Sequence, residues 1–374
     1  MYESQSWRHI LLTDGARCLT WINETEARII KLQVIADDLE LYLKSVLRKR
    51  ETCIAFWEAI PNIRNACNDN KTYEKPLAAE AYAYVHFLDK YWRTWDVLME
   101  LTEKGALPLG IEGIRILDIG AGPAPTAYAI NDFYRLLRDF GNDESIAAFL
   151  CQETEVKVIE SSPSMCHFIH HFSECTKRRG PFHAHKKDFA LVDPVSERIS
   201  LRKELQRMEY YDGSVNEYFD EYSPKEVNEI VQREERYRLV ILSNFLTLNE
   251  TVSKFEPNLR ALFSDLRGGS SVIIVGGRGI QYEKIYADLM SIAKSSGLTN
   301  MTELPTTLGS TSYSTAAGII KRCQNNIYQH LEQLTGNKSL SRTKDYPDYW
   351  NAEPSKKRRP DFRLQVFRKG RWPK

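Results

Sequence analysis

The sequence predicts an α/β protein in which a mostly parallel sheet follows an N-terminal helical region. Three observations support this fold class. Long helical patterns fill the first hundred or so residues, strand-like and helix-like segments alternate afterwards, and a glycine-rich turn follows the first strand-like run. Such alternation is typical of strand–helix–strand units on a parallel sheet. We therefore expect a helical region over residues 1–110 and an α/β domain over residues 111–374.

The composition favours a soluble intracellular protein. The chain has 374 residues, of which 42% are apolar and 27% charged, and this excludes the composition of a disordered chain. No apolar run approaches the roughly 18 residues of a membrane span, and the first residues do not resemble a secretory signal. The seven cysteines are scattered, which indicates reduced thiols. We expect a cytoplasmic location and no membrane partner, and the sequence leaves the oligomeric state open.

Two helical stretches are expected before the sheet. Residues 25–50 place apolar side chains at a 3.6-residue repeat, and residues 76–104 form a second stretch that ends where glycine and proline become frequent. The aromatic side chains of the second stretch have two interpretations, core packing or stacking on bases or an aromatic substrate. Their helical spacing favours the core. They are Tyr82, Tyr84, Phe87, Tyr91, Trp92 and Trp95.

The α/β region alternates regularly, with two interruptions. The interruptions, at about 194–236 and 310–350, are expected to be insertions that either face a substrate or are peripheral; the second contains a helical stretch over 314–336. Residues 361–369 are expected to form the last strand. The other expected strands are 114–119, 156–160, 237–244 and 271–275, and the expected helices are 124–137, 164–177, 254–266 and 282–296.

The most informative residues are 114–126, with the sequence IRILDIGAGPAPT. A buried strand leads into Asp118, and Gly120 and Gly122 then form a tight turn that opens a helix. Glycines let the backbone approach a ligand without a Cβ in the way, and the helix start aims N–H groups at it. We expect a cofactor here. The residues expected to hold it are Asp118, Gly120, Ala121, Gly122 and Pro123.

This stretch resembles motif I of class I S-adenosyl-L-methionine (SAM)-dependent methyltransferases, Asp/Glu-x-Gly-x-Gly-x-Gly, with Ala124 at the third glycine position. The resemblance implies a Rossmann-like sheet with an antiparallel last strand, and SAM as cofactor. Asp118 lies two residues before the first glycine, unlike the acid of a dinucleotide fingerprint. In that place it can receive the ammonium end of the methionine moiety, directly or through water.

A second acidic residue, Glu160, supports the same cofactor. Glu160 ends the next expected strand, where a carboxylate can accept both ribose hydroxyls of the adenosyl group, and Ser161 follows it. Glu160 lies 40 residues after Gly120, twice the usual ~20, so we expect an extra helix across 142–151. The alternative is a surface glutamate after a buried strand.

Weaker candidates follow the third and fourth strands. Asp188 can hold the adenine amino group with Phe189 against the ring, although an ordinary turn aspartate fits as well. Residues 237–246 resemble motif IV, which makes Ser243 and Asn244 the catalytic candidates, with Ser243 also near the cofactor. The Asn/Asp-Pro-Pro-Tyr tetrapeptide of many amino-methylating enzymes on nucleic acid is absent. Methyl transfer can proceed by alignment, so we name no general base.

A group of histidines and cysteines invites a metal interpretation. Their spacing lacks the paired cysteines of zinc sites, so we expect polar helix surface and no metal. The group consists of Cys166, His167, His170, His171, Cys175, His183 and His185.

Charge is unevenly distributed around a net value of +1. Residues 355–374 hold nine lysines or arginines against Asp361 alone, which suggests an anionic partner such as RNA. The alternative is a basic end that keeps an edge strand from pairing with other molecules.

Residues 80–250 also resemble, more faintly, the methyltransferase-like proteins that assist assembly of the small ribosomal subunit; the iron–sulfur cysteine set that those proteins often carry has no match here. Two functions therefore remain. One is a SAM-dependent methyltransferase with an undetermined acceptor, RNA being favoured. The other is a catalytically silent SAM-binding module that acts in RNA or protein assembly. The intact Asp118, Gly120, Gly122 and Glu160 favour the enzyme.

Overall fold

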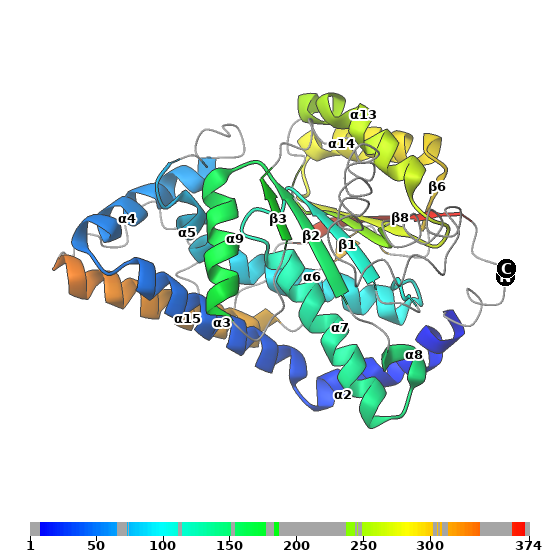
Figure 1. Ribbon diagram of the computed structural model, residues 1–374, viewed down its shortest axis with the longest axis horizontal. Helices are drawn as coiled ribbons and strands as arrows, with labels where there is room; N and C mark the ends of the chain where they lie inside the picture. Colours follow the sequence, from blue (N-terminus) through cyan, green and yellow to red (C-terminus); the bar gives the residue numbers. More distant parts are fainter. Residues whose placement is uncertain are drawn as a thin grey trace, which may run out of the picture.

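The computed structural model describes residues 8–65, 73, 75–110, 114–150, 154–176, 183–186, 237–243, 245, 249–301, 305, 307–308, 313–336 and 361–370. An eight-stranded sheet carries helices on both of its faces (Figure 1). Over these ranges, no helix combines the length and the apolar content needed to cross a membrane.

The sheet has the strand order β3-β2-β1-β4-β5-β8-β6, with β7 also paired to β8. The first five strands are parallel, whereas β8 runs antiparallel to β5. The expected fold class, a Rossmann-like methyltransferase sheet with an antiparallel last strand, is confirmed. The strands are β1 (Ile114–Ile119), β2 (Thr154–Glu160), β3 (His183–Lys186), β4 (Leu239–Ser243), β5 (Ser271–Gly276), β6 (Leu298–Asn300), β7 (Thr307–Leu308) and β8 (Phe362–Lys369).

The helices largely follow the expected periodicity. The first expected helix divides at Leu47, which leaves helical geometry, and the second is continuous through one π-helical turn. The helices are η1 (Leu11–Gly15), α2 (Ala16–Glu24), α3 (Ala27–Val46), α4 (Arg50–Asn65), α5 (Ala78–Tyr82), η4 (Ala83–Phe87), α6 (Leu88–Glu103), α7 (Pro125–Asp143), α8 (Ala147–Leu150), α9 (Pro163–Cys175), α13 (Asn249–Asp265), α14 (Ile280–Ser295) and α15 (Tyr313–Thr335). The long α7 and the short α8 account for the wide spacing between the glycine turn and β2.

Alternate residues of each strand face two different helical layers. Ile116 of β1 belongs to the larger buried cluster, which contains the N-terminal helices, α6, α7 and α9. Leu117, the next residue, belongs to a second cluster formed with α13 and α14. Figure 1 shows the yellow α13 and α14 on one side of the sheet, and α6 and α7 on the other. Both faces of the central strands are therefore buried, as a parallel sheet requires.

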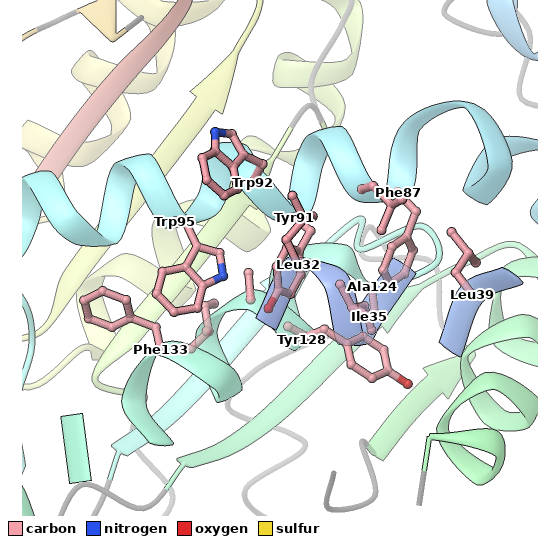
Figure 2. Packing of buried hydrophobic residues seen from close by; sticks show 14 of the residues in the cluster. Leu32, Ile35, Leu39, Phe87, Tyr91, Trp92, Trp95, Ala124, Tyr128 and Phe133 are labelled. Carbon is pink, nitrogen blue, oxygen red and sulfur yellow. The ribbon is translucent and has the colours of Figure 1, made fainter. Parts of the chain in front are cut away.

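The aromatic stretch packs in the larger cluster. Phe87, Tyr91, Trp92 and Trp95 are buried, and the ring of Trp95 meets that of Phe133 edge to face at a centroid distance of 5.2 Å (Figure 2). Buried aromatic rings contribute large apolar areas to a core. The core interpretation is confirmed for these residues.

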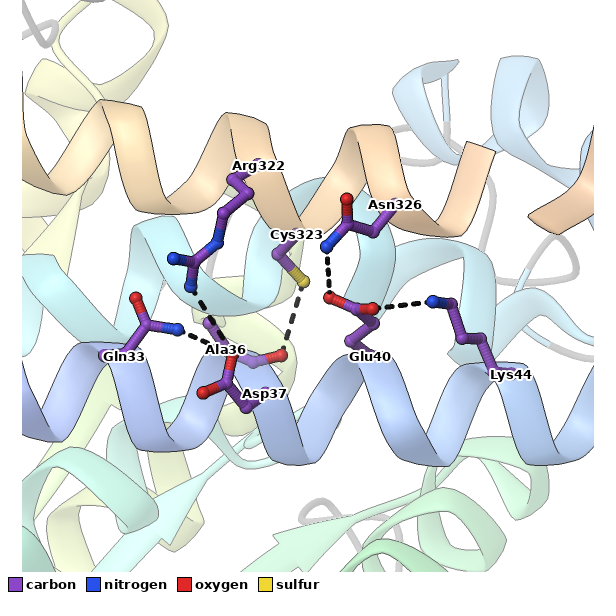
Figure 3. A network of polar contacts seen from close by, with 8 residues as sticks. All are labelled: Gln33, Ala36, Asp37, Glu40, Lys44, Arg322, Cys323 and Asn326. Carbon is purple, nitrogen blue, oxygen red and sulfur yellow. Dashed lines mark hydrogen bonds and ion pairs between the residues drawn. The ribbon is translucent and has the colours of Figure 1, made fainter. Parts of the chain in front are cut away.

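Helix α15, from the second expected insertion, lies beside α3 of the N-terminal region (Figure 3). The buried Cys323 thiol approaches the Ala36 carbonyl oxygen at 3.4 Å, and Asn326 Nδ2 donates to Glu40 Oε2 at 2.8 Å. Segments nearly 290 positions apart thus form one helical layer. The insertion at 194–236 lies outside the described residues, and the division of the chain near residue 110 stays a prediction.

Basic residues of the C-terminal segment form ion pairs and hydrogen bonds within the folded protein. Arg363 pairs with Glu283 at 2.6 Å, and Lys369 Nζ donates to the carbonyl oxygens of Phe263 and Ser296. Strand β8 lies between β5 and β6. The idea that these charges protect an edge strand is therefore wrong for β8, because both of its sides are paired.

Candidate cofactor and active site

The turn after β1 uses two glycines in the left-handed region, at φ +65° for Gly120 and +58° for Gly122. A Cβ on Gly120 would lie 2.8 Å from Cγ of Phe245, which leaves no room for a side chain. The nearest atom to a Cβ on Gly122 would be Cε1 of Tyr82, at 3.8 Å. The missing side chain of Gly120 therefore allows Phe245 to pack against the turn, whereas the missing side chain of Gly122 leaves open space beside the turn.

Ala124, at the third glycine position of the motif, also adopts a left-handed conformation, with φ 61°. It forms the N-terminal cap of α7, and Pro125 starts the helix. Outside glycine, this conformation costs about 1 kcal/mol. The turn geometry is thus that of a three-glycine motif, and alanine is accommodated there with strain.

Glu160 joins this turn to the loop after β2. Its carboxylate accepts a 2.7 Å hydrogen bond from the Gly122 amide and a 2.9 Å bond from the Ser162 amide. Burial raises the pKa of Glu160, and the hydrogen bonds from these amides oppose that rise. The side chain is only 9% exposed, so the alternative of a surface glutamate is wrong.

Asp118 is the most unusual group of the site. It is fully buried, and neither carboxyl oxygen accepts a hydrogen bond from the part of the chain that the structure describes. Burial raises its pKa to about 7; the charge of Lys90 acts against that rise, and the charge of Glu160 adds to it. Buried polar groups are nearly always hydrogen-bonded. This carboxyl therefore needs a donor from outside the described residues.

Strand alternation explains why the polar candidates meet. Asp118 continues the face of β1 that carries Ile116, and Glu160 continues the face of β2 that carries Val158, both toward the larger cluster. Ser243 continues the corresponding face of β4 and is partly exposed. The ends of three neighbouring parallel strands thus place Asp118, Glu160 and Ser243 on one face of the sheet.

Two side chains at the site come from the helical region. The sequence analysis did not consider Lys90, and it gave Tyr82 two interpretations, core packing or stacking on bases or an aromatic substrate, with the core favoured. Tyr82 lies beside Gly122, and Lys90 Nζ lies 4.9 Å from the Tyr82 ring centroid and hydrogen-bonds its hydroxyl. Tyr82 is partly exposed, so the core interpretation does not describe it fully. Tyr82, His86 and Lys90 recur every four residues on one helix face. This polar stripe is the sequence pattern that could have identified Tyr82 and Lys90 as site residues.

Phe245 is a third residue that the sequence did not single out. It follows β4, covers Gly120 and packs against Phe255 with ring centroids 4.9 Å apart. Its contact with the turn links the end of β4 to the end of β1. Sequence spacing carries no signal for this long-range contact.

The remaining candidates are placed less closely. Pro123 is buried in the turn, Ala121 is partly exposed and Ser161 is exposed. Asn244, Asp188 and Phe189 lie outside the described residues.

The histidine and cysteine group is divided between two elements, with the members from residues 166 to 175 on α9 and His183 and His185 on β3. The rings of His167 and His171 have centroids 4.1 Å apart. Within the described ranges, no group of three or more histidine, cysteine, aspartate or glutamate side chains could hold a metal ion.

Comparison with known proteins gives structural likeness alone. No family model and no curated protein sequence matches the chain. Coclaurine N-methyltransferase bound to N-methylheliamine and S-adenosylhomocysteine (SAH) aligns with 91% of this chain and 98% of its own, at 10% identity and a TM-score of 0.40. The N-methyltransferase NodS from Bradyrhizobium japonicum WM9 in complex with SAH aligns with 76% and 89%, at 9% identity and a TM-score of 0.33.

A TehB-like SAM-dependent methyltransferase from Corynebacterium glutamicum ATCC 13032 Kitasato aligns with 79% of this chain and 100% of its own, at 11% identity and a TM-score of 0.34. The order of the strands and the antiparallel β8 are those of the class I methyltransferase fold.

Proposed function

We propose that the chain is a SAM-dependent methyltransferase whose cofactor lies against the turn from Asp118 to Ala124. The observation that carries this proposal is the buried Asp118 carboxyl, which accepts no hydrogen bond from the described residues. SAM carries an ammonium group in its methionine moiety, and an ammonium donates charge-assisted hydrogen bonds to a carboxylate. Such a ligand would offset the cost of burying Asp118.

Glu160 is the proposed ribose residue. Each of its carboxylate oxygens already accepts one amide hydrogen bond, and a carboxylate has about four acceptor positions, so it can accept ribose hydroxyls as well. The Gly122 amide donates to Glu160, and the missing side chain of Gly122 leaves room for the ligand. Asp188 and Phe189 stay proposed contacts for adenine.

When bound, SAM supplies an electrophilic methyl group. The chain's own part is to hold the cofactor and to align the acceptor, since a displacement at a methyl carbon depends strongly on orientation. Ser243 is the last residue of β4, on the strand next to β1, and we propose Ser243 and Asn244 as the residues that orient the acceptor. The basic residues of 355–374 favour RNA as that acceptor.

Calorimetric titration with SAM tests the binding step. We expect wild-type protein to bind, and Asp118→Asn and Glu160→Gln each to weaken binding at least tenfold. Glu155→Gln is the matched control, because Glu155 lies near the other end of β2 and pairs with Arg115. The proposal fails if wild-type protein does not bind SAM, or if the control weakens binding as much as the site variants do.

Transfer is tested separately, with methyl-labelled SAM and total cellular RNA, protein or small-molecule extract as acceptors. Label in RNA that is lost in Ser243→Ala or in Asn244→Ala would support the enzyme. SAM binding without label in any acceptor would favour the silent assembly module.

A further inference from the structure

A ligand-sized cavity lies along α9, with walls from α3, α5 and α9. Its volume is about 780 Å³, within the range of small-molecule sites, about 300–1,000 Å³. Helix α9 contributes Ser164, His167, His171 and Cys175, which recur at helical spacing on one face. None of these four residues belongs to the turn that holds the proposed cofactor.

Glu80 of α5 is the buried polar group of this cavity. Its side chain lines the cavity although the residue is only 6% exposed. The Tyr42 hydroxyl donates to Glu80 Oε1 at 3.5 Å, which is long for an O–H···O bond. Burial raises the pKa of Glu80, and its own backbone amide, Tyr42 and His171 each oppose that rise.

Aromatic packing holds Tyr42, the hydrogen-bond partner of Glu80, in position. Tyr42 meets Phe168 edge to face at 5.0 Å and Phe172 at 5.5 Å, and all three side chains are buried. Rotamers locked by packing keep a functional group preorganised. Glu80 and the Tyr42 hydroxyl therefore form a polar group with a fixed position in the cavity wall.

The charge balance of the cavity favours a cation. Glu80 and Glu174 both line it, and none of the described lining residues is a lysine or an arginine. The pKa of His167 is lowered by burial and by the neighbouring His171 and His170, which favours its neutral form. Val46 and Leu77 add apolar surface. A ligand with a positive charge and an apolar body matches this lining.

We propose that this cavity binds a small organic amine, with its protonated nitrogen paired to Glu80 and its apolar body against Val46 and Leu77. A carboxylate that is already desolvated by folding pays less of that cost again when the amine arrives, and the resulting hydrogen bonds are charge-assisted. None of the residues that line this cavity is among those proposed to hold SAM, so it is a further ligand site of the chain.

Calorimetry with tryptamine and tryptophol tests the charge requirement, because the two share an indole body and differ in amine against hydroxyl. We expect full-length wild-type protein to bind tryptamine at least tenfold more tightly than tryptophol at pH 7.5. Glu80→Gln should remove that preference. Glu155→Gln is the control, because Glu155 does not line the cavity, and it should change tryptamine affinity less than threefold.

A second variant covers the case in which Glu80→Gln fails to fold. Ser45→Trp places a large ring into the cavity from α3 and should abolish tryptamine binding while leaving SAM binding unchanged. Equal binding of the two probes, no binding of tryptamine, or unchanged binding in both Glu80→Gln and Ser45→Trp would overturn the proposal. Asp118→Asn should lose SAM but keep tryptamine, so failure of one site is distinguishable from failure of the other.

Discussion

Asp118→Asn is expected to stabilise the ligand-free protein, and to do so more strongly as pH rises. Burial is the main cause that raises the carboxyl pKa from 3.8 to about 7. The unfolded chain therefore ionises near pH 4, whereas the folded chain keeps its proton until about pH 7. Because the folded state binds more protons between these values, stability falls as pH rises through this window, by about 4 kcal/mol in total.

Asparagine has nearly the same shape and no charge, so it removes this penalty. The expected gain in the free energy of unfolding is about 2 kcal/mol at pH 5 and about 4 kcal/mol at pH 8. Urea unfolding followed by tryptophan fluorescence at both pH values measures it. Asp132→Asn is the control, because the buried Asp132 carboxylate already accepts a 2.5 Å hydrogen bond from Tyr91 and should lose stability when changed.

The reasoning is refuted if Asp118→Asn is no more stable than wild type at pH 8, or if its gain does not grow between pH 5 and pH 8. If Asp118→Asn is more stable than wild type and still binds SAM as tightly, the electrostatic explanation of stability holds, but Asp118 does not contact the cofactor. Stability and affinity should therefore be measured on the same preparations.

The remaining predictions concern the same turn. SAM affinity should rise with pH through about 7 as Asp118 ionises and level off above it, and calorimetry across pH 6–8.5 that finds flat affinity would contradict this. Gly120→Ala should lower the free energy of unfolding by about 3 kcal/mol, because the new Cβ would clash with Phe245 and alanine is strained in the left-handed conformation. Gly122→Ala should lower it by only about 1 kcal/mol, because its Cβ has space, but should weaken SAM binding at least tenfold. Equal unfolding midpoints for the two variants would exclude that difference. Ala124→Gly should raise stability by about 1 kcal/mol in the same urea assay without loss of SAM binding, and a loss of stability would show that the left-handed strain is absent.

Much of the proposed cofactor site could be predicted from local patterns. The strand from residue 114, the two glycines and the helix that follows are contiguous, so their geometry depends on neighbouring residues. Glu160 could be predicted as well, because the ends of adjacent parallel strands meet at one edge of the sheet. Whether these residues bind SAM is a prediction that the titrations test.

The depth of Asp118 could not be predicted in this way. Ile116, on the same face of β1, belongs to a buried cluster that contains residues of α6 and α7, and this packing is made by residues distant in sequence. The same packing brings Tyr82 and Lys90 to the turn. The polar stripe on this helix indicates that one face is not packed in the apolar core, but only the structure shows that this face lies at the glycine turn.

By itself, the sequence determined the order of helices and strands, the glycine turn and the two acids that follow parallel strands, because these depend on short-range periodicity and backbone preference. Only the tertiary structure decided that α15 packs on α3, that Phe245 covers Gly120 and that Glu80 is buried in a cavity. Each of these depends on contacts between segments far apart in the chain. Such contacts are selected by the shape and charge of whole surfaces, which no local pattern of residues specifies.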